Sequence, residues 1–198
     1  MNISKFTQKS VEAVQNCEKL AYEYGNQQID QEHLLVSLLK LDDSLIVKLI
    51  TKMGISGEQF TDEAEAALKK LPKVSGGGQV YLTQDLNKVL IDAEDEAKAM
   101  GDEYVSVEHL FLCLLKEPNR AIKELFRTYG IDRNKFLQAL STVRGNQRVT
   151  SDNPEATYDT LNKYGSDLVE KARDQKMDPV IGRDAEIRNV IRILSRKT

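Results

Sequence analysis

Apolar residues recur along most of this chain with the spacing of one-sided α-helices. They stand three or four positions apart, as at Leu34, Leu35, Leu38 and Leu39, and no long run alternates between apolar and polar residues. The first spacing is typical of helices that pack by one face, whereas strict alternation is typical of half-buried strands. The pattern therefore predicts an all-α fold, and we expect no sheet.

Glycines divide the pattern into eight predicted helices, in two sets of four. Gly25 and Gly101 follow the first helix of each set, where a residue with positive φ is favoured. The first set is predicted at about 6–24, 32–40, 44–53 and 57–70, and the second at about 82–100, 108–116, 120–129 and 133–143.

The two sets are copies of one sequence. The phrase E-H-L-L-V-S-L-L-K at 32–40 returns as E-H-L-F-L-C-L-L-K at 108–116, and residues 6–60 align with 82–136 without a gap. Four short helices bury little apolar surface alone, so we expect the two copies to pack against each other. The sequence thus predicts two pseudo-symmetric four-helix repeats that form one domain.

A polar segment separates this duplicated region from the end of the chain. G-N-Q-R-V-T-S-D-N-P-E-A-T holds almost no apolar residue and predicts a flexible linker. Apolar positions such as Leu161 and Leu168, and later Ile187 and Leu194, then predict two further helices. The predicted organisation is a domain at 1–144 with repeats at about 1–71 and 80–144, a linker at 145–157 and a helical segment at 158–198.

Composition and charge narrow the class of protein. The chain is 40% hydrophobic and 30% charged with a net charge of −3, which is typical of a soluble globular protein. We expect no membrane partner, because no apolar run approaches the roughly 18 residues of a membrane span. Basic residues form no run, so we expect no nucleic-acid partner. The absence of a leader pattern favours a cytoplasmic location.

The repeated Glu-His pair is the first candidate for chemistry. His109 and Cys113 are four residues apart and could share a metal on one helix face. However, Ser37 replaces Cys113 in the other copy, and Cys17 lies on an apolar stripe. Adjacent Glu and His side chains also point about 100° apart, which suits an acid–base pair poorly. We therefore predict no metal and no catalytic residue: each glutamate favours the start of its helix, and each histidine bonds locally.

The tail and the repeat both resemble one known family. L-N-K-Y-G-S-D-L-V-E-K-A-R at 161–173 and D-P-V-I-G-R at 178–183 resemble the entry into the first AAA+ module of the Clp/Hsp100 unfoldases. The duplicated E-H-L, with T-Q at 7–8, resembles their amino-terminal Clp repeat domain. L-P-K-V-S-G-G-G at 71–78 is most similar to the ClpB, or disaggregase, branch, and the protease-partner branches ClpA and ClpC are the alternative.

The resemblance implies a function for a longer parent protein. The parent would be a cytoplasmic homohexamer that uses ATP with Mg to thread unfolded or aggregated polypeptides through its pore, together with the DnaK chaperone system. This domain would capture those polypeptides, whereas in the alternative branch it would dock adaptors or read degradation tags. We expect this chain by itself to be a monomer.

The resemblance also places part of a nucleotide site in the tail. Val180, Ile181 and Gly182 would contact the adenine of ATP, but the phosphate-binding Walker A loop would lie beyond Thr198. We therefore expect this chain to hold no cofactor of its own and not to be an enzyme.

Polar residues for substrate handling follow from the same resemblance. Thr7, Asp102 and Glu108 match positions that affect the work of such domains. Capping is the alternative role, because Thr7 stands near a helix start and Glu108 in a first turn.

The family also uses an apolar groove beside the fifth and sixth helices to bind hydrophobic segments. In this chain Asp92 and Glu96 stand where some relatives carry leucines, and His109 replaces another, so His109 joins the predicted substrate-binding residues. We expect a more acidic groove, with weak and salt-sensitive binding of unfolded protein.

Overall fold

The structure, a computed structural model, describes residues 2–154 and residue 158. The described residues form the predicted eight α-helices, so the all-α fold is confirmed. The first repeat contains η1 (Ile3–Lys5), α1 (Gln8–Glu23), β1 (Gln28–Ile29), α2 (Gln31–Lys40), α3 (Leu45–Lys52) and α4 (Gly57–Lys69). The second contains β2 (Tyr81–Leu82), α5 (Gln84–Ala99), α6 (Val107–Lys116), α7 (Arg120–Tyr129) and α8 (Arg133–Arg144).

The first helix of each repeat begins and ends in the same way. The Thr7 hydroxyl accepts a hydrogen bond from the Ser10 N–H, and the Thr83 hydroxyl does the same for the Leu86 N–H. These N-caps satisfy backbone donors that a helix leaves without partners. After each helix comes a glycine with positive φ, Gly25 at 68° and Gly101 at 72°. Both helix boundaries follow the prediction from sequence.

Two short strand contacts tie the repeats together. β1 pairs with β2 in parallel, with Ile29 opposite Leu82, and Phe6 forms a parallel bridge with Val105. Leu82 is the copy of Phe6, and Val105 is the copy of Ile29. In both contacts, the segment before the first helix of one repeat therefore pairs with the segment before the second helix of the other repeat. The expectation of no sheet is therefore wrong: two-residue strands are too short to show alternation in a sequence.

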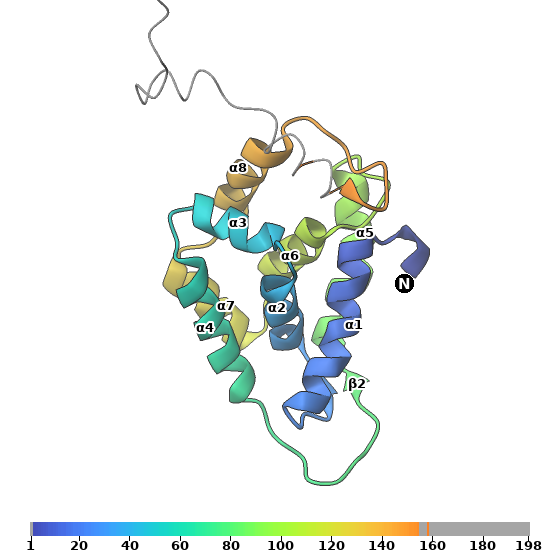
Figure 1. Cartoon of the computed structure of the whole chain (residues 1–198), viewed down its shortest axis with the longest axis vertical. Helices are drawn as coiled ribbons and strands as arrows, with labels where there is room; N and C mark the ends of the chain where they lie inside the picture. The colour runs from blue at the N-terminus through green and yellow to red at the C-terminus, as the bar shows by residue number, and fades with distance from the viewer. Residues whose placement is uncertain (1, 155–157, 159–198) are drawn as a thin grey trace, which may run out of the picture. The chain divides into compact units, whose positions relative to one another are not determined.

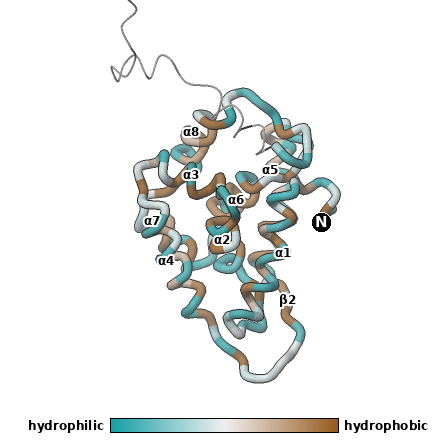
Figure 2. The backbone as a smooth tube through the Cα atoms, viewed as in Figure 1, coloured by the Kyte–Doolittle hydropathy of each residue, from teal (hydrophilic) through white to brown (hydrophobic). Residues whose placement is uncertain are grey.

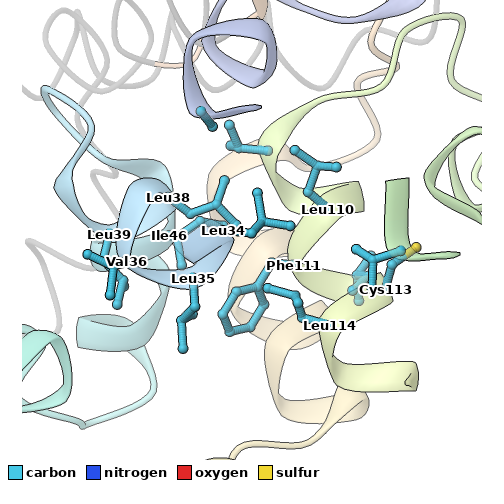
Figure 3. Packing of buried hydrophobic residues seen from close by; sticks show 14 of the residues in the cluster. Leu34, Leu35, Val36, Leu38, Leu39, Ile46, Leu110, Phe111, Cys113 and Leu114 are labelled. Carbon is cyan, nitrogen blue, oxygen red and sulfur yellow. The ribbon is translucent and has the colours of Figure 1, made fainter. Parts of the chain in front are cut away.

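The core lies between the two copies of the repeated phrase. α2 and α6 run through the middle of the domain, between α1 and α5 on one side and the remaining helices on the other (Figure 1). Their apolar residues form the brown centre of Figure 2, and Leu34, Leu35, Leu110 and Phe111 lie close together in Figure 3. All four side chains are fully buried in one core cluster that spans both repeats, which confirms that the copies pack together.

The segment predicted as a linker differs from that prediction over its first ten residues. Residues 145–154 lie against the domain, with Val149 and Pro154 buried. The remaining predicted linker residues, the tail helices and the predicted adenine contacts Val180, Ile181 and Gly182 lie outside the described residues. Within the described part, no helix is both long and apolar enough to cross a membrane.

Candidate functional site

The Glu-His pair of the first repeat forms a buried corner at the start of α2. We call Asn26, Asp30, Glu32, His33 and the neighbouring Asn119 the first corner. The Asp30 N–H donates to His33 Nδ1 over 2.9 Å, and His33 Nε2 lies 3.0 Å from Asn26 Oδ1. This pattern places the histidine proton on Nε2, and burial lowers the pKa of His33. His33 thus closes a capping box with Asp30.

The second repeat builds the same corner with a carboxylate in place of the amide. We call Asp102, Ser106, Glu108, His109 and Arg144 the second corner. The Ser106 N–H donates to His109 Nδ1 over 2.9 Å, and His109 Nε2 donates to Asp102 Oδ2 over 2.7 Å. Both ring nitrogens therefore bond within the protein, as the prediction of local bonding requires.

Arg144, at the end of α8, pairs with the two carboxylates of the second corner. Its guanidinium donates to Asp102 Oδ1 and, over 3.3 Å, to Glu108 Oε1, and all three side chains are buried. Burial by itself would raise the pKa of Asp102, but hydrogen bonds from His109, the Val149 N–H and Arg144 outweigh it. The pKa of Asp102 therefore lies below its ordinary value of 3.8.

In the first corner, no cation of the described residues pairs with Glu32. Its Oε1 accepts from Asn119 Nδ2 over 3.0 Å, and its Oε2 is buried with no hydrogen-bond partner among the described residues. Burial, with a smaller contribution from the charges of Asp30 and Asp85, raises the pKa of Glu32 above 4.5. Leu68 occupies the position that corresponds to Arg144.

A cavity of about 680 Å³ opens beside Glu32, between α4 and α7. Ala66, Ala67, Leu125 and Tyr129 contribute its apolar wall, and acidic and basic side chains stand at other points of the lining. A cavity of this size holds several side chains of an extended peptide. The cavity therefore combines apolar surface with a carboxylate oxygen that still needs a donor.

The residues predicted to bind substrate lie below the surface. Asp102, Glu108 and His109 meet in the second corner, and each is nearly or fully buried. Thr7 is fully buried too, and its backbone N–H donates over 2.9 Å to the carbonyl of Val105, which directly precedes Ser106 of the second corner. The predicted capping by Thr7 is confirmed, and a role of these four residues in substrate binding stays a prediction.

The acidic residues of the predicted groove are paired. Glu96 is buried and forms an ion pair with Arg133 of α8. Asp92 shares a hydrogen bond with Glu117 that raises the pKa of Asp92, and Lys88 Nζ lies 2.9 Å from Glu117. Charge on this face is thus partly neutralised by neighbouring side chains, which weakens its pull on a cation in solvent.

Sequence reasoning missed Arg144, Asn119 and the cavity. The repeat alignment ends at Phe136, so Leu68 and Arg144 were never set against each other. Extending the same 76-residue offset by eight positions places an arginine where the other copy has leucine. Nothing in the sequence signals Asn119, because its partner Glu32 is distant along the chain.

The model of the Clp repeat (R) N-terminal domain family matches residues 5–129. The chain belongs to this family. The Clp repeat region resembles ClpB throughout: the chain is 49% identical over 203 residues to the chaperone protein ClpB of Nitratidesulfovibrio vulgaris and 46% identical over 202 residues to that of Bacillus cereus strain ATCC 10987. All of the chain is covered in both comparisons, but only 24% and 23% of those proteins, so the chain spans about a quarter of their length.

Solved structures share the fold of this Clp repeat domain. The Hsp104 N-terminal domain of Candida albicans superposes with a TM-score of 0.67 at 22% identity, covering 75% of this chain and 97% of that one. A ClpV N-domain in complex with a VipB peptide superposes with a TM-score of 0.58 at 18% identity, covering 75% and 92%. At these identities the likeness establishes the fold alone.

Proposed function

We propose that this domain is the substrate-binding amino-terminal domain of a ClpB-like disaggregase. It would capture unfolded or aggregated polypeptides for a hexameric AAA+ ring that uses ATP with Mg and works with the DnaK system. The proposal rests on the ClpB relatives and on the duplicated Clp repeat. The peptide complex of a ClpV N-domain, which has the same fold, supports peptide capture as a use of this fold.

We further propose that the cavity between α4 and α7 is where polypeptide segments bind. The observation that carries this is that Glu32, whose buried Oε2 has no hydrogen-bond partner among the described residues, lines a cavity with both apolar and charged side chains. A buried carboxylate oxygen without a donor costs free energy, and a bound segment would relieve that cost by supplying one. An apolar segment with a lysine or arginine fits both the wall and the carboxylate.

Thr7, Asp102, Glu108 and His109 would then act on capture indirectly. Their side chains are buried, and we propose that they maintain the second corner and its junction with α1 rather than touch the polypeptide. Changing them would alter binding only as far as it alters the folded domain.

A peptide-binding measurement tests the cavity proposal. The probes are two fluorescein-labelled 15-residue peptides with the same apolar residues, one with two arginines and one with citrulline at those positions. We expect the arginine peptide to bind the chain more tightly in fluorescence anisotropy. Ala121→Trp, at an exposed position of the lining, should weaken its binding at least about tenfold by filling the cavity.

Ala99→Trp is the matched control, because Ala99 is exposed at the end of α5 and does not line this cavity. The Ala99→Trp variant should bind the arginine peptide as tightly as the unaltered chain does. Equal loss of binding in both tryptophan variants, or none in either, would contradict the cavity as the site. Equal binding of the arginine and citrulline peptides would contradict the role of Glu32.

A further inference from the structure

The first ten residues of the predicted linker are held on the domain at several points. We call residues 145–154 the strap. The Val149 N–H donates to Asp102 Oδ1 over 3.0 Å, and Val149 O accepts from the Glu103 N–H over 2.9 Å. Further along, the Asp152 carbonyl accepts from the Gln8 N–H over 2.7 Å. Val149 is fully buried, so the strap has both a hydrogen-bonded and an apolar anchor.

Two arginines, Arg144 and Arg148, link the strap to the ends of neighbouring helices. Arg148 donates from its guanidinium to the carbonyl of Met100, at the end of α5. Arg144 donates from Nε to Gln147 O over 2.8 Å while its other nitrogens reach the second corner. The strap is thus connected to the ends of α5 and α8 at once.

Asp102 joins all these parts through one side chain, as Arg144 does from the other side of their ion pair. Oδ1 accepts from Arg144 of α8 and from the strap, and Oδ2 accepts from His109 of α6. Its backbone follows Gly101 at the end of α5. A fully buried carboxylate that accepts three hydrogen bonds is fixed in position, and its donors are fixed with it.

The first repeat ends in a related way. After α4, the Val74 N–H donates to the carbonyl of Gly25 over 2.9 Å, and Asn26 Nδ2 donates to Pro72 O over 3.0 Å. Asn26 and Gly25 are the copies of Asp102 and Gly101. Each repeat therefore ends by returning over the turn that follows its own first helix, and the strap is the last part of the second repeat.

We infer that the strap is a folded clasp, and that Asp102 is the positioning residue that keeps it closed. The folded domain then extends to residue 154 rather than ending at residue 144. Opening the clasp would release ten residues, or up to about 35 Å of extended chain. Asp102 would thereby decide whether residues 145–154 stay part of the folded domain, a role separate from polypeptide capture.

Hydrogen exchange and limited proteolysis of the 198-residue chain test this inference. We expect the amides of Val149 and Glu103 to be protected and trypsin to cleave slowly after Arg148. Asp102→Asn should speed both exchange and that cleavage at least about tenfold, with α2 and α6 still protected. Glu103→Gln is the control, because it removes the same charge from the next residue, whose side chain is exposed.

A second variant keeps the test decisive if Asp102→Asn unfolds the domain. Val149→Asp disrupts the buried anchor from the strap side and leaves every residue of the second corner in place. It should free residues 145–154 to exchange and cleavage while the melting temperature changes little. Unprotected strap amides in the unaltered chain would overturn the inference, and so would a strap that stays protected in Val149→Asp.

Discussion

The two corners share one backbone and differ in where their charge is balanced. Both place a histidine at the third position of a helix, with its Nδ1 accepting from a backbone N–H 2.9 Å away. The first histidine contacts Asn26, and the second contacts Asp102, which pairs with Arg144. Leu68 stands at the sequence position that corresponds to Arg144. Asparagine with leucine needs no counter-charge, whereas aspartate in the same buried place needs the arginine.

The glutamates show what this difference means. Each has a buried Oε2 without a hydrogen-bond partner among the described residues, but Oε1 of Glu108 bonds to a guanidinium, whereas Oε1 of Glu32 bonds to a neutral amide and Glu32 lines a cavity. Under the proposed function, one copy of the motif would hold the chain together and the other would bind a ligand. Four single substitutions, one double variant and one titration test this comparison between the repeats.

Arg144→Leu gives the second corner the leucine of the first and should have the largest effect. It leaves two buried carboxylates, Asp102 and Glu108, without their cation. Removing one partner of a buried ion pair costs roughly 3–5 kcal/mol. Urea denaturation followed by circular dichroism should show a loss of unfolding free energy in that range.

The double variant Asp102→Asn/Arg144→Leu is the matched control, because it copies both residues of the first corner. Its loss should be smaller than that of Arg144→Leu alone, since one of the two stranded charges has gone. A double variant that is less stable than the single one would contradict the account of charge balance.

Glu108→Gln and Glu32→Gln should separate the two copies by a smaller amount. Glu108→Gln loses a charged hydrogen bond with Arg144 and should cost about 2 kcal/mol in unfolding free energy. Glu32→Gln keeps an acceptor for Asn119 and removes a buried charge, so we expect a change below about 1 kcal/mol. The same urea titration measures both, and equal losses would show that the corners do not differ as described.

Cys17→Ala should have the smallest effect, because Ala93 fills the corresponding position of the second repeat. Cys17 is buried, and desolvation raises the pKa of its thiol to about 12, so it behaves as a small apolar residue. We expect less than about 1 kcal/mol of destabilisation by thermal melting. A loss of several kcal/mol in unfolding free energy would mean that the surroundings of Cys17 in α1 and of Ala93 in α5 are not equivalent.

The fold could be predicted because its information is local and repeated. Helix spacing, the threonine caps and Gly25 and Gly101 each depend on a few neighbouring residues, and the copies support each other. The strands of two residues and the strap could not be predicted in this way. Their hydrogen bonds join residues far apart in the chain, such as Val149 with Asp102 or Ile29 with Leu82, and polar composition alone made residues 145–154 resemble a free linker.

The site was predicted only in part, for the same reason. The sequence picked out Glu108 and His109 and their capping geometry, since both lie within one helical turn of Ser106. Asp102 is buried together with its partner Arg144, and Glu32 lines the cavity between α4 and α7. Such properties arise from packing between distant helices.

Carboxyl titration by NMR tests the central claim most directly. The claim is that Arg144 balances the carboxylate charge of the second corner, whereas no cation of the described residues balances that of Glu32 in the first. Asp102 faces His109, Arg144 and the Glu108 carboxylate, and Glu32 faces Asp30 and Asp85. By sign, the low pKa of Asp102 adds stability that is present above pH 3.8 and lost as the pH falls below it. The raised pKa of Glu32 adds stability at low pH that is lost as the pH rises above 4.5.

The carboxyl carbons of the chain can be assigned by comparison with spectra of Asp102→Asn and Glu32→Gln. We expect the titration midpoint of Asp102 to lie below pH 3.8 and that of Glu32 above pH 4.5. If both carboxyl groups titrate at their ordinary values, or if both midpoints shift in the same direction, the claim is contradicted.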